Sequence, residues 1–73
     1  MERYTIEPST RPGQWACTDN ENSIACTFED GEFNETQESV HFGVERPDMM
    51  TMARYMSEMG DWLRENHYDK IFP

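Results

Sequence analysis

Lysine and arginine are absent between Arg11 and Arg46, where the sequence instead carries eight acidic residues. These are Asp19, Glu21, Glu29, Asp30, Glu32, Glu35, Glu38 and Glu45. The rest of the chain holds seven acids and six basic residues, so nearly all of the net charge of −9 comes from this block. Such acidity disfavours direct binding to nucleic acids, because their phosphates are contacted by Lys and Arg. It disfavours binding to anionic membrane surfaces for the same reason.

Long apolar runs and targeting signals are also missing. No apolar stretch approaches the roughly 20 residues that a membrane-spanning helix needs. Residues 1–7 lack the basic and apolar segments of a secretory signal, so a cytoplasmic location is expected. In that compartment the only two cysteines, Cys17 and Cys26, are expected to be free thiols. No catalytic or cofactor motif is present, which indicates a protein that is not an enzyme and needs no cofactor.

The chain is expected to form one small domain over residues 1–73, with a thin hydrophobic core. Alternating apolar residues predict strands over about residues 3–7, 14–19, 24–29 and 32–37, while residues 39–44 form either a further strand or a loop. Asp30-Gly31 is a strong signal for a type I′ hairpin turn, which would place Phe33 beside Phe28 on the core face.

The register between the second and third predicted strands follows from their apolar faces, which must point to one core. A loop of residues 20–23 satisfies this condition, and so does a loop of residues 20–21. We prefer the longer loop because it places Cys17 opposite Cys26 and Trp15 opposite Phe28, and aromatic cross-strand pairs stabilise sheets.

Three further apolar residues, Val40, Phe42 and Val44, alternate with the opposite parity to Phe33. If they belong to the same core face, a bulge is expected near residues 38–39.

A helix is predicted over about residues 47–66, with Pro47 at its first position and Asp48 in its first turn. At helical spacing one apolar stripe contains Met49, Met52, Ala53, Met56, Gly60, Leu63 and His67. Arg54 and Glu58 are spaced to pair across one turn. Residues 68–72 are expected to fold back as an apolar tail. The predicted fold class is α+β, an antiparallel β-meander of three to four strands packed by one C-terminal amphipathic helix.

Four residues have the ligand types that zinc prefers: Cys17, Cys26, His41 and His67. Their spacing lacks the pair two to four residues apart that is typical of zinc sites. Two buried thiols are therefore preferred to a metal site, and no metal ligands are predicted. A cross-strand disulfide fits the longer loop, but only in an oxidising setting.

Two surfaces are candidates for binding a partner. The first is an acidic sheet face formed by Glu29, Asp30, Glu32, Glu35 and Glu38. A face of one charge sign repels itself, so its presence is more easily explained if it attracts a basic partner. The second is an apolar shoulder of the helix, which contains aromatic residues of the kind enriched in interfaces: Met50, Tyr55, Met59 and Trp62.

These features predict a small acidic interaction module that binds a basic surface of a partner protein. In one form of this hypothesis the partner is a nucleic-acid-binding protein, and carboxylates take the place of phosphates. In size and charge the chain resembles small acidic proteins that inhibit nucleases, a resemblance of composition and not of motif. One alternative is a homodimer that associates through the helix shoulder. Another is a metal-binding module that uses the cysteines and histidines.

Overall fold

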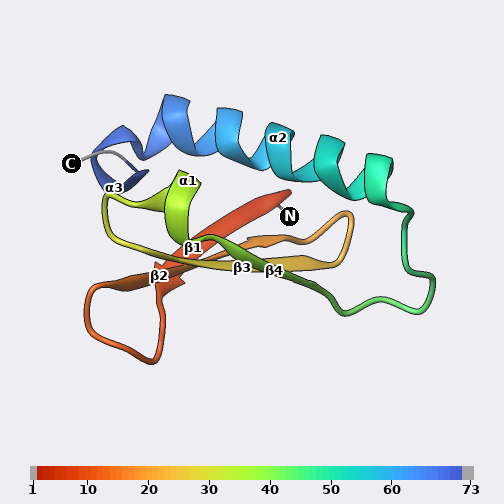
Figure 1. Ribbon diagram of the computed structural model, residues 1–73, viewed down its shortest axis with the longest axis horizontal. Helices are drawn as coiled ribbons and strands as arrows, with labels where there is room; N and C mark the ends of the chain where they lie inside the picture. The colour runs from red at the N-terminus through yellow and green to blue at the C-terminus, as the bar shows by residue number, and fades with distance from the viewer. Residues whose placement is uncertain (1, 72–73) are drawn as a thin grey trace.

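The computed structural model describes residues 2–71 and contains a four-stranded sheet covered by helices on one face (Figure 1). The strands are β1 (Tyr4–Pro8), β2 (Gln14–Asp19), β3 (Ile24–Glu29) and β4 (Glu38–His41). The helices are α1 (Phe33–Thr36), α2 (Met49–Asn66) and α3 (Tyr68–Ile71). The strands follow one another in the order β1-β2-β3-β4, and every pair is antiparallel. The predicted α+β meander with a C-terminal helix is confirmed.

The core lies between the sheet and α2 (Figure 1). Period-2 alternation directs one set of strand side chains to this side. Its buried apolar members are Tyr4, Cys17, Ile24, Cys26 and Phe28, and Ile6 and Trp15 are partly buried beside them. The helix contributes Met59 and Leu63, both fully buried. Phe33 of α1 and Ile71 of α3 close one end of the core.

The register of the central hairpin follows the longer of the two predicted loops. Cys17 lies opposite Cys26, and Trp15 lies opposite Phe28. The loop of residues 20–23 ends at Ser23, which has a φ of 58° in the left-handed region. Aromatic pairing and the shared apolar face were therefore sufficient to predict this register.

The predicted type I′ hairpin at Asp30-Gly31, and the strand predicted over residues 32–37, are wrong. A type I′ turn needs a positive φ at both central residues, but of these two only Gly31 has one, at 75°. The Gly31 N–H instead donates to the main-chain oxygen of Lys70 in α3, at 2.7 Å. The chain then forms the short helix α1, from which Phe33 still reaches Phe28, with ring centroids 5.0 Å apart.

The segment after α1 forms the short edge strand β4, which covers only the first part of the stretch considered for a strand or a loop. Val40 lies opposite Ala25, whereas its neighbour Ser39 lies opposite the core residue Cys26. Val40 therefore points to the sheet face away from the helices. The bulge expected near residues 38–39 is not needed, because the preceding residues are helical and their side chains do not alternate with those of β4.

The long helix α2 begins two residues later than expected. Asp48 is its N-cap, and the carboxylate accepts a hydrogen bond from the Thr51 N–H at 2.8 Å. Pro47 thus precedes the cap instead of opening the helix. The predicted tail is the one-turn helix α3, in which Ile71 is buried and Tyr68 is exposed. Phe72, which was expected to join this tail, lies outside the described residues.

Candidate functional site

The acids predicted to share a sheet face lie on different parts of the molecule. Glu29 and Glu38 are on the sheet face away from α2, since their strand neighbours Phe28 and Ser39 point toward the core side. Glu35 belongs to α1, on the opposite side of the sheet. The acidic residues therefore surround the end of the sheet where β3 leads into β4, and the expectation of a single acidic sheet face is wrong.

Two of the five acids have partners within the fold. Glu29 forms an ion pair with Arg11, and Asp30 accepts a hydrogen bond from the Trp15 indole N–H at 2.9 Å. The other three, Glu32, Glu35 and Glu38, are exposed, and none of them forms an ion pair within residues 2–71. We call these three residues the acidic rim. Their charge is available to an external partner.

The predicted apolar shoulder is not one surface. Met59 is fully buried at the centre of the core. Trp62 is half-buried and stacks on Tyr4, with ring centroids 5.2 Å apart. Tyr55 is also half-buried, and the Arg54 guanidinium lies 5.3 Å from its ring centroid. Only Met50, which is 85% exposed, is available as the prediction required.

Apart from Tyr68 in α3, the large apolar side chains that are exposed in residues 2–71 occur along one continuous part of the chain, from β4 to the first turn of α2. Val40 is 64% exposed and Phe42 is 59% exposed, and Val44 is also exposed. Met49 and Met50 follow at the start of α2. The sequence signal for this surface was the alternation of residues 40, 42 and 44 with a parity opposite to that of Phe33. This parity is explained by side chains that point outward, and not by the bulge that was expected.

The main chain of β4 also presents unpaired groups. In an antiparallel pair, hydrogen-bonded residue pairs alternate with unbonded ones. The Phe42 N–H donates to the Ser23 oxygen at 2.8 Å, so Val40 and Glu38, two and four residues earlier, also direct their main-chain groups toward β3. Ser39 and His41 therefore direct their N–H and C=O groups away from the sheet. No other strand of the described chain pairs with this side of β4.

The opposite edge of the sheet is protected. The Ser9 N–H donates to the Gln14 oxygen at 2.8 Å, which places Pro8 of β1 among the residues that face outward. Proline has no N–H to donate, and it is a common device against edge pairing. Neither β4 nor the residues that follow it as far as Arg46 include a proline.

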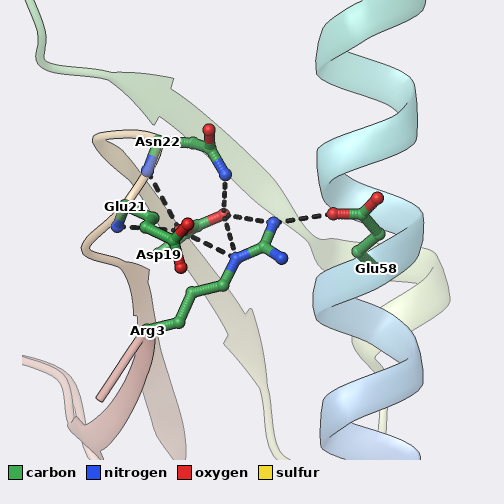
Figure 2. Close-up of polar contacts among 5 residues, drawn as sticks. All are labelled: Arg3, Asp19, Glu21, Asn22 and Glu58. Atoms are coloured by element: carbon green, nitrogen blue, oxygen red, sulfur yellow. Dashed lines mark hydrogen bonds and ion pairs between the residues drawn. The ribbon is translucent and has the colours of Figure 1, made fainter. Parts of the chain in front are cut away.

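An ion-pair network centred on the buried carboxylate of Asp19 joins Arg3, just before β1, to the end of β2 and to α2 (Figure 2). The Asp19 carboxylate is fully buried and accepts hydrogen bonds from Arg3 Nη2 at 3.2 Å, from Asn22 Nδ2 at 2.9 Å and from the Glu21 N–H at 3.0 Å. Arg3 Nη2 also donates to Glu58 Oε1 at 2.7 Å. Glu58 thus binds Arg3 in place of the predicted partner Arg54.

The network has the properties of a structural cross-link. Burial by itself would raise the pKa of Asp19, but the hydrogen bonds from Arg3 and Asn22 outweigh it and hold that pKa below its usual range. A carboxylate that is ionised, shielded from solvent and already hydrogen-bonded by three neighbours has no free position for a substrate. The sequence pattern did not indicate the ion pair of Asp19 with Arg3, because the two residues are brought together only by the pairing of β1 with β2.

The cysteines are free thiols packed against each other in the sheet, and both are fully buried. Burial raises the pKa of Cys17 and of Cys26 to about 12, so neither forms a thiolate near neutral pH. Among residues 2–71 no three His, Cys, Asp or Glu side chains lie close enough together to hold a metal ion. Within the same residues, no helix has the length and apolar character needed to cross a membrane.

Comparison of the chain with protein-family models, with curated proteins and with solved structures gave no match. The acidic rim and the β4 edge are therefore the candidate binding surfaces of the molecule.

Proposed function

We propose that the protein is a small interaction module that binds a basic surface of a partner protein. The observation that supports this most directly is the acidic rim, three exposed carboxylates without an ion pair in the described chain. The rim lies within a stretch that has no Lys or Arg to offset it. Mixed charges would keep the surface equally soluble, so the single sign is better explained by attraction of a basic partner.

A narrower form of the proposal is that the partner is a nucleic-acid-binding protein, whose basic groove accepts carboxylates in place of phosphates. The module would then act as an inhibitor of that protein, in a cytoplasmic setting where the buried thiols stay reduced. The alternative of a homodimer through the helix shoulder is less well supported, because Met59, one of its four proposed contact residues, is in the core.

The test is a pull-down with the tagged protein at low and high salt, in which bound proteins are identified by mass spectrometry. The variant carries Glu32→Gln, Glu35→Gln and Glu38→Gln. The matched control carries Glu2→Gln, Glu7→Gln and Glu65→Gln, three exposed acids outside the block, and changes the net charge equally.

We expect a basic partner that the wild type and the control retain at low salt, that the rim variant loses, and that high salt releases because exposed charges are screened. Equal retention by the rim variant and the control would contradict the proposal. Competition of the captured partner with duplex DNA and with RNA tests the nucleic-acid mimic in particular.

A further inference from the structure

We infer that the free edge of β4 binds an extended segment of the partner as a fifth strand of the sheet, with apolar side chains beside Val40 and Phe42 and a basic side chain beside Glu38 on the same face. This inference rests on the proposed function, since it names the form that the basic partner takes at this site. Addition of a strand to an open sheet edge is a known mode of peptide recognition. In that mode the main-chain hydrogen bonds supply affinity and the side chains supply specificity.

The main-chain geometry of β4 fits this mode. Ser39 and His41 direct their N–H and C=O groups away from β3, and within residues 2–71 no strand pairs with this side of β4. An incoming strand would hydrogen-bond to these two residues. Its side chains would lie beside those of β4, because strands in one sheet share their pleat.

The side chains of β4 define the composition of the incoming segment. Val40 and the following Phe42 are large, apolar and exposed, so they favour apolar neighbours on the incoming strand. Glu38 is exposed at the start of β4 and favours a Lys or Arg beside it. Glu35 and Glu45, on either side of this segment, are exposed and extend the same preference.

Charge also argues against a second copy of this chain as the occupant. Two copies joined through β4 would bring together two acidic blocks in chains of net charge −9 each, which repel one another. A basic segment is instead attracted by the negative charge of the acidic block. The β1 edge does not compete for it, because Pro8 removes a donor and Glu7 is exposed there without large apolar neighbours.

The probe is a synthetic peptide of about ten residues, long enough for one strand. Every second position carries Lys, Val, Val and Lys in turn, with threonine between them, so that the valines can lie beside Val40 and Phe42 and a lysine beside Glu38 on one face. One control peptide has the same side chains but is N-methylated at every residue, which removes all main-chain donors. The other control replaces every lysine by glutamate. Binding is measured by titration calorimetry, and the main-chain contacts are measured by amide hydrogen exchange in NMR spectra of the protein.

We expect the lysine peptide to bind at least tenfold more tightly than either control. The amides of Ser39 and His41 should become protected on binding, whereas those of Val40 and Phe42 should change little because they already bond to β3. This alternation along the strand is a readout that attraction between charges alone would not produce.

The protein variant for this test is Val40→Lys, which places a positive charge on the exposed edge and should weaken the lysine peptide at least tenfold. Thr5→Lys is its matched control. Thr5 is exposed on the same face of the sheet at the opposite edge, and the change in charge is the same. Binding that both substitutions weaken equally would overturn the inference, since only general charge would then matter.

The outcomes separate this inference from the proposed function. Equal binding of the N-methylated and unmodified lysine peptides would overturn strand addition, while attraction of a basic partner would stand. Equal binding of the glutamate and lysine peptides would overturn the basic character of the segment. Failure of all three peptides would overturn strand addition whatever the pull-down shows. Dimers in sedimentation that Val40→Lys abolishes would also overturn it, because a second copy would then occupy the edge.

Discussion

Arg3, which directly precedes β1, binds the fully buried carboxylate of Asp19, with Nη2 and Oδ2 3.2 Å apart. Removing the guanidinium leaves a buried charge without its cation. We expect Arg3→Met to lower the free energy of unfolding by about 2 kcal/mol, the cost of losing hydrogen bonds to a charged group.

The control is Glu58→Gln, which alters only the half-exposed end of the network and should cost less than about 1 kcal/mol. Urea unfolding monitored by tryptophan fluorescence measures both. Equal effects of the two substitutions would show that burial of Asp19 does not dominate the network.

The pKa of Asp19, held below its usual range, makes a prediction about acid stability. A carboxylate with a lowered folded-state pKa stabilises the fold fully above its unfolded-state pKa, and this stabilisation is lost as the pH falls through the folded-state pKa. The difference in stability between the wild type and Asp19→Asn should therefore be constant near neutral pH and shrink below the ordinary aspartate range. Urea midpoints of both proteins measured across acid pH test this. A difference independent of pH would contradict it.

The placement of Met59 separates a core residue from a surface one. We expect Met59→Ala to destabilise the fold by about 2–5 kcal/mol, because it removes a buried side chain and leaves a cavity. Met50→Ala, the same substitution at an exposed position of the same helix, should stay within about 0.5 kcal/mol. Thermal and urea unfolding measure both variants. Similar small losses of stability for the two variants would show that Met59 is exposed and not part of the core.

The turn at Asp30-Gly31 gives a test that distinguishes the observed structure from a type I′ hairpin. In a type I′ turn Asp30→Gly would be tolerated or would stabilise, since both positions favour glycine. In the observed structure Asp30→Gly removes the acceptor of the Trp15 indole N–H. We therefore expect it to lower the free energy of unfolding by about 1 kcal/mol. Gly31→Ala, at a φ of 75°, should cost about 1–2 kcal/mol. A stability gain for Asp30→Gly would favour the hairpin.

The thiols of Cys17 and Cys26 should be unreactive in the folded protein. Both are fully buried, and burial raises the pKa of each to about 12, so the reactive thiolate is scarce at neutral pH. We expect a thiol reagent such as DTNB to label both cysteines at once in urea, but in native buffer only as fast as the protein unfolds. Rapid labelling of the native protein would show that the sheet opens locally around this pair.

The central hairpin and the long helix could be read from the sequence because local rules decide them. Trp15, Cys17, Ile24 and Phe28 alternate with period 2, and only one register lets both apolar sets face a core while pairing the aromatic residues. The error at residues 32–37 has a different origin. Asp30-Gly31 satisfies the local rule for a hairpin, but the N–H of Gly31 bonds to Lys70, far away in the sequence.

The candidate site was predictable in part. Absence of Lys and Arg located the acidic block, and the unpartnered rim lies within it. Which of its acids are neutralised was not predictable, since Arg11 reaches Glu29 and Trp15 reaches Asp30 only once the sheet is formed. The exposed apolar edge was visible in the parity of Val40 and Phe42, but parity alone does not say which face the helices cover.

The amino-acid sequence by itself determined the charge distribution, the alternation of the strands and the amphipathic helix, because each depends on residues close together in the chain. The tertiary structure decided which side of the sheet α2 covers, that Met59 and not Met50 enters the core, and that β4 keeps a free edge. These features depend on contacts between distant segments, such as Arg3 with Glu58 and Gly31 with Lys70. Such contacts form only when the whole chain has folded, so the local preferences of the sequence do not reveal them.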